Sequence, residues 1–417
     1  MDNKAMTLPI DGPQSRLISV DDALAYVLER AKPLQEIELL PLEQSLGRVV
    51  ARTEHSRIDV PAFNNSSMDG YAIRSQDTHA RPRVELTVTQ RIPAGQSGSI
   101  LGPGEAARIF TGAPLPEGAD AVVIQEDCER DGDRVTFKGP ISASQHVRPR
   151  GNNIAIGAQV LPEGIRLRPQ DVGMAAAVGL TDIALIRRLR VGFFSSGDEL
   201  IQPGKTLQPG QIYNSNRFTL MGLLENLGCE TTDLGIVEDS LARTQAVLRG
   251  AAEDMDLIIT SGGVSVGEED HVKHALETTG TLEMWQVAVK PGKPLAYGRI
   301  GEADFLGLPG NPVSTLVTFC LFVRPFILRR QGLKEVAPRP ILVNADFSWP
   351  TPMRRREFVR ARLEGSGEST RASLYHKQGS DVLASTVWAD GLVEIPEQST
   401  INPGDKVSYL AFSQLLQ

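Results

Sequence analysis

The chain has 417 residues, which at the usual size of roughly 150 residues per domain predicts about two to four domains and excludes a single small module. Lys and Arg number 43 against 51 Asp and Glu, so the formal charge of −8 lacks the basic excess that nucleic-acid backbones attract. With 41% hydrophobic and 23% charged residues, the composition is that of a globular protein. We expect no nucleic-acid partner.

The N-terminal helical and β-type runs suggest an interrupted first domain. Ser19 can cap an amphipathic helix that runs to Arg30. Residues 60–139 are punctuated by Gly and Pro and hold short β-type runs, and a helix-like run follows at 169–180. We therefore predict an elongated N-terminal domain from residues 1–59 and 140–182, with a β-rich domain inserted at 60–139.

Residues 183–332 alternate β-type and helical runs, which predicts a parallel sheet covered by crossover helices. The β-type runs are 190–196, 231–237, 256–260, 284–290, 294–300 and 304–310, and the helical runs are 217–228, 241–253, one beginning near 268, and 311–332. Residues 214–216 offer caps for the first helix, and Gly228 can end it in a left-handed conformation. These features predict a doubly wound α/β domain.

Residues 338–417 predict a small β-domain, because short β-type runs alternate with turns at 341–347, 357–364, 391–397 and 405–412. The most apolar stretch of the chain, 316–328, is interrupted by Arg324 and Pro325 and is too short to span a bilayer. Residues 1–14 contain no apolar run that could serve as a signal peptide. The three cysteines are far apart in the chain, so they form no local zinc knuckle. We expect a cytoplasmic protein without membrane contact.

Residues 263–267 match GxSxG between a strand and a helix, the setting of a hydrolase nucleophile elbow. Four residues separate Thr260 from Ser265, however, so the loop is long for an elbow, and His376 lies in the predicted C-terminal domain. The alternative is a glycine-rich turn whose amides, with the following helix N-terminus, bind an anion such as phosphate. We favour the anion-binding turn, with Ser261, Gly262, Gly263 and Ser265 as substrate-binding residues.

The segment 268–274 offers two metal hypotheses. His271 and His274 share a helix face near acidic residues, which would suit a transition metal. Acids in a first helical turn are also common because they offset the positive end of the helix. We favour an acid acting on a hard cation such as Mg²⁺. Residues 102–107 loosely fit GxGxxA, but Pro103 and the following β-type run exclude a dinucleotide fingerprint.

Polar residues collect after the predicted strands, at 195–199, 238–240, 261–270, 290–294 and 308–312. Ligands of an open parallel sheet bind beyond the carboxyl ends of its strands, so these five loops can converge on one pocket. Three loops carry carboxylates and one carries two lysines. This mixture suits a phosphate-bearing ligand held by a divalent cation on one side and by ammonium groups on the other.

Several long motifs closely resemble the molybdopterin molybdenumtransferase (MoeA) family, which is related to the E domain of gephyrin. They are NSSMDGYA (65–72), RIFTGAPLPEGADAVVIQED (108–127), VRPRG (147–151), SSGDEL (195–200), IYNSN (212–216), TSGGVSVGEEDHVK (260–273), VKPGKPLAYG (289–298), GLPGNPVS (307–314), QGSDVLAS (378–385) and GLVEIP (391–396). They follow the family's order, and the resemblance spans nearly the whole chain.

The resemblance implies a transferase of molybdenum-cofactor biosynthesis that inserts molybdate into adenylylated molybdopterin and releases AMP, with Mg²⁺ support. It implies catalytic roles for Asp69, Thr111, Glu199, Asp239 and Asp270, with Glu199, Asp239 and Asp270 as metal ligands. It implies substrate-binding roles for Lys290, Lys293, Pro309, Pro312, Arg355, Arg356 and Ser385. Lysines, an arginine and hydroxyls suit a dianion such as molybdate, and carboxylates suit Mg²⁺ beside a phosphate.

The resemblance also implies a homodimer whose chains share each site, a MogA-like α/β molybdopterin-binding domain and a C-terminal β-barrel. The implied partners are a molybdopterin adenylyltransferase and downstream cofactor-using enzymes. One departure concerns Asn152 and Asn153, which stand where family members commonly have acids. Two alternatives remain open: the adenylyltransferase itself, and a non-catalytic molybdopterin-binding scaffold or paralogue.

Overall fold

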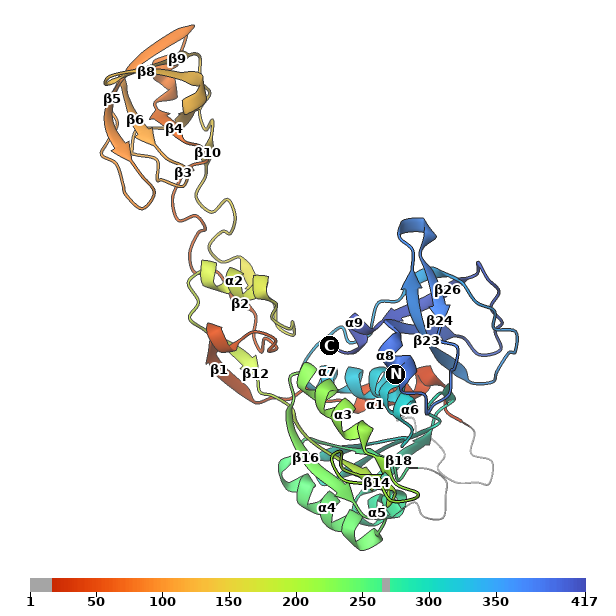
Figure 1. Ribbon diagram of the computed structural model, residues 1–417. Coiled ribbons are helices and arrows are strands. Elements are labelled where there is room, and N and C mark those ends of the chain that lie inside the picture. The colour runs from red at the N-terminus through yellow and green to blue at the C-terminus, as the bar shows by residue number, and fades with distance from the viewer. Residues whose placement is uncertain (1–16, 265–270) are drawn as a thin grey trace, which may run out of the picture. The chain divides into compact units, whose positions relative to one another are not determined.

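The structure is a computed structural model that describes residues 17–264 and 271–417 (Figure 1). The described chain divides into two compact units. The larger unit holds residues up to 38 with 47–49 and 186–417, and the smaller unit holds residues 39–46 and 50–185. Each unit has buried hydrophobic clusters of its own.

In the described part of the larger unit, a six-stranded sheet has the order β16-β13-β17-β21-β20-β18. Its strands are β13 (Arg190–Ser196), β16 (Glu230–Val237), β17 (Leu257–Ser261), β18 (Thr281–Gln286), β20 (Pro294–Ile300) and β21 (Ala303–Leu308). The first four strands in this order run parallel, whereas β20 and β18 are antiparallel to their neighbours. The parallel part confirms the predicted α/β fold. Of the antiparallel edge, β20 matches the predicted run 294–300, whereas β18 overlaps the predicted run 284–290 only at residues 284–286.

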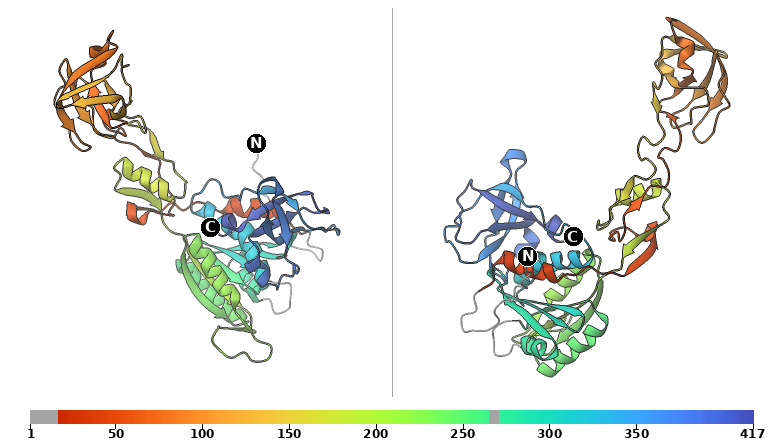
Figure 2. Two further views of the ribbon diagram at one scale, coloured as in Figure 1. Left: turned by 45° about the horizontal axis from the view of Figure 1, so that its top comes forward. Right: turned by 180° about the vertical axis from the view of Figure 1, so that it is seen from behind.

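Helices cover both faces of this sheet (Figures 1 and 2). They are α1 (Val20–Arg30), α3 (Ser215–Asn226) and the run from α6 on one face, and α4 (Leu241–Asp254) and α5 (His271–Thr279) on the other. Phe193 and Phe194 are neighbours in β13, yet they belong to the opposite cores on these two faces. Such alternation is expected for a strand that is buried on both sides.

The capping signals predicted from the sequence are present. Ser19 Oγ accepts from the Asp22 backbone N–H at 3.1 Å, and Asn214 Oδ1 accepts from the Arg217 N–H at 3.2 Å. Gly228 follows α3 with φ of +72°, a left-handed conformation that glycine adopts at little cost. These contacts explain why α1 and α3 begin, and why α3 ends, at these residues.

One long helical run crosses the larger unit. It consists of α6 (Pro312–Thr318), a π-helical turn (Phe319–Val323) and α7 (Arg324–Arg330). The π-turn lies just before Pro325, which lacks the N–H of a regular helical ladder, so the wider turn lets the helix continue past the proline. Within the described residues, only Pro312–Arg330 is long and apolar enough for a membrane span, and 83% of its window is buried inside the protein, as in core helices.

The C-terminal residues of the larger unit form a closed five-stranded barrel in the order β23-β24-β22-β26-β25, with β25 pairing back to β23. Its strands are β22 (Ile341–Ala345), β23 (Arg356–Glu364), β24 (Arg371–Leu374), β25 (Gly391–Ile395) and β26 (Lys406–Ala411). Four of them match predicted β-type runs, and β24 was not predicted. A short strand of the α/β part, β19 (Val289–Lys290), adds to β23 in parallel.

The smaller unit contains a six-stranded sheet in the order β7-β4-β6-β5-β9-β8. Its strands are β4 (Gly70–Ile73), β5 (Arg83–Ile92), β6 (Glu105–Ile109), β7 (Ala121–Ile124), β8 (Cys128–Asp131) and β9 (Arg134–Lys138). This sheet falls inside the predicted β-rich insertion. Outside it, β2 (Glu54–His55) pairs with β11 (Gln159–Leu161), and Val50 bridges to Leu185. These pairings join residues before the insertion to residues after it, while the exact domain boundaries stay predictions.

Candidate active site

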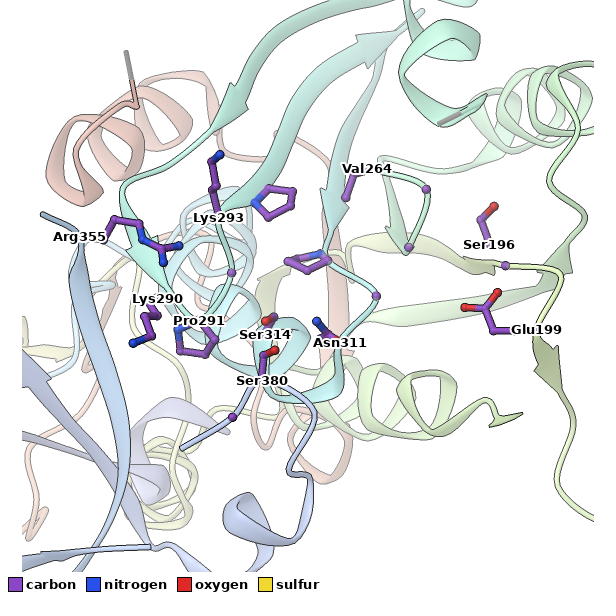
Figure 3. Close-up of a pocket in the computed structure, with 18 of the residues that line it drawn as sticks. Ser196, Glu199, Val264, Lys290, Pro291, Lys293, Asn311, Ser314, Arg355 and Ser380 are labelled. Carbon is purple, nitrogen blue, oxygen red and sulfur yellow. The ribbon is translucent and has the colours of Figure 1, made fainter. Parts of the chain in front are cut away.

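A pocket of about 610 Å³ lies at the carboxyl ends of β13, β17 and β21 in the larger unit (Figure 3). It is lined by Ser196, Gly197, Glu199, Asp239, Gly262, Gly263, Val264, Lys290, Pro291, Gly292, Lys293, Pro294, Pro309, Gly310, Asn311, Ser314, Arg355, Gln378, Gly379 and Ser380. All five loops that the sequence predicts to converge contribute to it. The barrel adds two segments, one at Arg355 and one at 378–380.

Acidic side chains occupy one end of the pocket. The Ser196 hydroxyl donates a 2.5 Å hydrogen bond to Asp239 Oδ1, and the Asp198 backbone N–H donates to Asp239 Oδ2 at 3.3 Å. Glu199 is exposed and lines the same end, beside Ser196 (Figure 3). The loops after β13 and β16 thus present two carboxylates to one ligand.

The glycine turn after β17 is shaped by steric requirements. Gly262 has φ of +94°, and a Cβ there would lie 2.4 Å from the Ser196 carbonyl oxygen. Gly263 has φ of +67°, and a Cβ there would lie 2.5 Å from a methyl group of Val272. The Gly262 N–H donates to the Leu308 carbonyl at 3.0 Å, so this amide serves the sheet edge and not an anion. Ser265 and Asp270, which the sequence places in the same loop, lie outside the described residues.

Asn216 joins two of the converging loops. Its Nδ2 donates to Ser261 Oγ at 3.0 Å and to the Gly310 carbonyl at 2.7 Å. Ser261 is 2% exposed and does not line the pocket, although it was predicted to bind substrate. The sequence predicts only a capping role for Asn216, because its cross-loop contacts depend on the sheet topology.

The turn between β21 and α6 brings the protein backbone to the pocket wall. Pro309 lines the pocket, and its carbonyl accepts from Thr315 Oγ1 at 2.6 Å. Pro312 opens α6 at the first helical position, where its missing N–H costs nothing, and it is not a lining residue. Of the two predicted prolines, only Pro309 therefore faces the ligand space.

Basic side chains occupy the other end of the pocket. Figure 3 shows Lys290, Lys293 and Arg355 there, with Ser380 and Ser314 nearby. Lys290 Nζ lies 2.6 Å from Glu357 Oε1, and Arg355 Nη1 donates to the Val289 carbonyl at 3.5 Å. Lysine and arginine side chains at one pocket end suit an anionic ligand.

A loop of the C-terminal barrel closes this end, and Arg360 holds it in place. Arg360 is 1% exposed, and its Nη2 donates to the Gly379 carbonyl at 3.0 Å. Its Nε donates to Ser385 Oγ at 3.0 Å. Ser385 is fully buried and does not line the pocket, whereas Ser380 does. The motif QGSDVLAS contains both serines, and the sequence alone did not show which one faces the ligand.

Arg356 does not line the pocket either, although it was predicted to bind substrate. Its guanidinium pairs with Asp21 at 2.7 Å and with Glu394 and Glu397 at 3.2 Å each. The hydrogen bond from Arg356 lowers the pKa of Asp21. The charge of Arg356 is compensated by three carboxylates outside the pocket, whereas its neighbour Arg355 lines the pocket beside Lys290 and Lys293.

Asp69 and Thr111 form a polar pair in the smaller unit. The backbone N–H and the hydroxyl of Thr111 each donate to Asp69 Oδ1 at 2.8 Å. These two hydrogen bonds lower the pKa of Asp69 and keep it ionised. Asp69 and Thr111 therefore form one local polar element of the smaller unit, and their catalytic roles stay predictions.

Within residues 17–264 and 271–417, no group of three His, Cys, Asp or Glu side chains has the arrangement of a metal site. His271 and His274 therefore form no such group with described residues. Two predicted Mg²⁺ ligands, Glu199 and Asp239, do line the pocket. The third, Asp270, lies outside the described part of the chain.

Fold and pocket together define a class: a multidomain α/β protein with a pocket at the carboxyl edge of its sheet, acidic at one end and basic at the other. Three family models match consecutive parts of the chain. The MoeA N-terminal region (domain I and II) matches residues 18–179, a probable molybdopterin binding domain matches 192–329, and the MoeA C-terminal region (domain IV) matches 343–412.

Curated relatives extend this match over nearly the whole chain. The molybdopterin molybdenumtransferase of Haemophilus influenzae is 37% identical, covering 96% of this chain and all of that protein. The Nostoc enzyme of the same name is 38% identical, covering 95% and 94%. A crystal structure of a molybdopterin biosynthesis MoeA protein from Pyrococcus horikoshii OT3 is similar with a TM-score of 0.83 at 28% identity, covering 95% of this chain and 100% of that one. The chain belongs to the molybdopterin molybdenumtransferase family.

Proposed function

We propose that this protein inserts molybdate into adenylylated molybdopterin and releases AMP, in a late step of molybdenum-cofactor biosynthesis. The observation that carries this proposal is the two-ended pocket, in which Glu199 and Asp239 face Lys290, Lys293 and Arg355. The substrate has a phosphoanhydride to be cleaved, and the second substrate is a dianion. A site for both needs an end that accepts a cation and an end that accepts an anion.

The basic end is the proposed molybdate site. Lys293 and Arg355 supply positive charge, and Ser380 supplies a hydroxyl within the same wall. Oxyanions bind through charge-assisted hydrogen bonds of this kind, which are stronger than neutral ones. Holding molybdate here would place it beside the pterin part of a ligand that extends across the pocket.

The acidic end is the proposed Mg²⁺ site. Glu199 and Asp239 have the oxygen donors that Mg²⁺ prefers, and the hydroxyl of Ser196 orients Asp239 by the 2.5 Å hydrogen bond. The residues present therefore fit the ion. When bound, Mg²⁺ supplies charge neutralisation at the phosphates. Asp239 and Glu199 orient that end of the ligand, and Ser196 keeps Asp239 in the binding rotamer.

We also propose a cytoplasmic homodimer in which Asp69 and Thr111 of one chain complete the site of the other. Both residues belong to the smaller unit, far in sequence from the pocket loops, yet they form a preorganised polar pair. A molybdopterin adenylyltransferase is the proposed supplier of the substrate, since the ligand must be adenylylated first. Enzymes that use the molybdenum cofactor are the proposed recipients of the product.

The adenylyltransferase alternative is disfavoured, because the relatives match the N-terminal and C-terminal regions as well as the α/β domain. The scaffold alternative rests on Asn152 and Asn153. Both are exposed, and the Asn153 backbone N–H donates to the Val60 carbonyl at 2.9 Å. In this loop Asp59 keeps an ion pair with Arg150 at 2.6 Å, so a carboxylate is retained nearby.

The test incubates purified protein with adenylylated molybdopterin, molybdate and Mg²⁺ and follows AMP release by chromatography. We expect turnover that requires all three components, and the same mixture without protein serves as the blank. The adenylyltransferase activity is assayed separately with molybdopterin and ATP, where we expect none. Tight binding of the adenylylated ligand without AMP release would favour the scaffold.

A further inference from the structure

The backbone register brings a pocket lysine beside a barrel glutamate. β19 pairs with β23 in parallel, with Val289 opposite Arg356 and Lys290 opposite Glu357. The pairing is extended by the Arg356 N–H, which donates to the Ala288 carbonyl at 3.0 Å. Lys290 therefore reaches the pocket from a strand that is shared between the α/β part and the barrel.

The side chains of this pair differ sharply in burial. The Glu357 side chain is 3% exposed, whereas the Lys290 side chain is 41% exposed. Lys290 Nζ lies 2.6 Å from Glu357 Oε1, and Trp349 Nε1 donates to Glu357 Oε2 at 2.8 Å. A buried carboxylate without a cation would be strongly unfavourable, so Glu357 holds the Lys290 ammonium at this position.

The second pocket lysine is in a different electrostatic situation. Among the described residues, no carboxylate lies within ion-pair distance of Lys293, which is exposed. Arg355 contacts a backbone carbonyl and, within residues 17–264 and 271–417, no acid. In the part of the pocket that the structure describes, the positive charge without an acidic partner is that of Lys293 and Arg355, while the charge of Lys290 is balanced by Glu357.

We infer that Glu357 is a positioning residue for the reaction, which acts by fixing Lys290 as an oriented hydrogen-bond donor, and that Lys293 supplies the unbalanced charge that attracts the anion. This inference rests on the proposed function. It separates the two lysines of one motif by role: Lys290 orients the bound substrate, and Lys293 attracts it. Trp349 completes the arrangement by fixing the other carboxylate oxygen.

The first experiment needs no turnover. Full-length protein is acetylated briefly with an N-hydroxysuccinimide ester, and modification of Lys290 and Lys293 is quantified by mass spectrometry. We expect Lys290 to react more slowly than Lys293 in the wild-type protein, because its ammonium is held in an ion pair. Glu357→Gln should speed modification of Lys290 several-fold and leave Lys293 unchanged. Equal rates at Lys290 in both proteins would overturn the inference.

The second experiment measures AMP release. Loss of orientation at a reacting centre costs up to about 100-fold, so Glu357→Gln should lower kcat by about 10- to 100-fold. The KM for molybdate should fall or stay constant, because the pocket loses a negative charge. Glu357→Asp, which keeps the charge, should recover part of kcat. In a Lys290→Met background, Glu357→Gln should have no further effect on kcat.

Controls separate positioning from folding. Glu364→Gln removes an exposed carboxylate on the same strand, 3.7 Å from Arg371, and should change neither labelling nor kinetics. If Glu357→Gln does not fold, Trp349→Phe takes its place. This variant removes only the hydrogen bond to the second carboxylate oxygen of Glu357, so kcat should fall by a smaller factor. An equal loss of kcat from Glu357→Gln with and without Lys290 would overturn the inference. If the wild-type protein releases no AMP, the proposed function fails, and the labelling rates still decide the role of Glu357.

Discussion

Arg360 Nε donates a 3.0 Å hydrogen bond to Ser385 Oγ inside the C-terminal barrel, and both residues are almost completely buried. The other bonds of this guanidinium go to the backbone carbonyls of Gly379 and Phe358, at 3.0 and 3.5 Å. Burial lowers the pKa of Arg360 to about 10, so it remains charged at neutral pH. The described hydrogen-bond partners of this buried cation are thus a hydroxyl and two carbonyls, and they include the loop that carries Ser380 to the pocket.

Replacing Arg360 should therefore affect stability and activity together. Arg360→Met leaves the Gly379 carbonyl and Ser385 without their donor, and we expect the free energy of unfolding to fall by about 2–4 kcal/mol. Ser385→Ala leaves the buried Arg360 Nε without its acceptor and should cost about 1–3 kcal/mol, while most activity is retained. Urea denaturation measures the stability of each variant, and AMP release measures its activity. Abolished activity in a fully stable Ser385→Ala protein would instead restore Ser385 as a substrate-binding residue.

The two serines show how far the sequence could specify the site. The motif QGSDVLAS identifies the segment, but Ser380 lies in a loop, whereas Ser385 lies in the short helix α8 (Ala384–Trp388) and is bonded to Arg360 of β23. The glycine turn is a similar case. Its composition predicts free amides, whereas the Gly262 N–H is used by the Leu308 carbonyl of the adjacent strand. In both cases the orientation of the group is set by contacts between segments that are distant in the sequence, so the local motif does not predict it.

The fold was more accessible to sequence analysis, because periodicity and capping are local. Ser19, Asn214 and Gly228 mark helix ends by their own chemistry, and the α/β strands have long apolar runs. β24 was missed because its four residues, RASL, are short and partly polar, and only Ala372 is buried in the barrel. Such a strand is defined by closing the barrel between β23 and β22, not by its own pattern.

Asp256 should make stability depend on pH. Burial alone would raise its pKa, but hydrogen bonds from Arg187 and from the Arg190 backbone outweigh burial and leave the pKa below its usual value. Because the folded-state pKa is lowered, the stabilisation is present above the unfolded-state pKa and is lost as the pH falls through the folded-state pKa. Asp256→Asn leaves Arg187 without its buried partner and should cost about 3 kcal/mol at pH 7.

Urea denaturation of wild-type and Asp256→Asn proteins at neutral and acidic pH measures the contribution of Asp256 to the free energy of unfolding. The difference should shrink as the pH drops below about 4, where the unfolded carboxyl becomes protonated. Glu335→Gln is the matched control, because its ion pair with Arg339 is fully exposed at 2.9 Å and should contribute at most about 0.5 kcal/mol. A pH-independent loss in Asp256→Asn would show that packing, and not charge, is responsible.

The two ends of the pocket should respond to different ligands. Lys293→Ala removes attraction that acts on bound and reacting molybdate alike, so it should raise KM for molybdate more than it lowers kcat, and high molybdate should restore the rate. Asp239→Asn weakens the proposed Mg²⁺ end, where charge develops during phosphate cleavage. It should lower kcat and stay slow at any molybdate concentration.

Separate titrations of molybdate and Mg²⁺ against both variants decide between the two roles. Extra Mg²⁺ should help Asp239→Asn in part and have no effect on Lys293→Ala. If molybdate restores Asp239→Asn, or if only Mg²⁺ restores Lys293→Ala, the assignment of the two ends is reversed. Wild-type protein is the reference in these titrations, and the Glu335→Gln variant is the control that should behave like it.

The final prediction concerns sharing of sites between chains. If Asp69 of one chain completes the pocket of the other, Asp69→Ala and Asp239→Ala proteins are each inactive, but a mixed dimer contains one intact site. Random exchange makes half of the dimers mixed, each with one of two sites intact, so the mixture should recover about a quarter of wild-type activity. The experiment denatures and refolds the two variants together and assays AMP release. Mixing Asp69→Ala with Thr111→Ala chains is the control and should recover nothing, because both changes affect the same element and every site carries one of them. No recovery in the first mixture, with mixed dimers verified by differential tagging, would mean that Asp69 and Asp239 act within one chain.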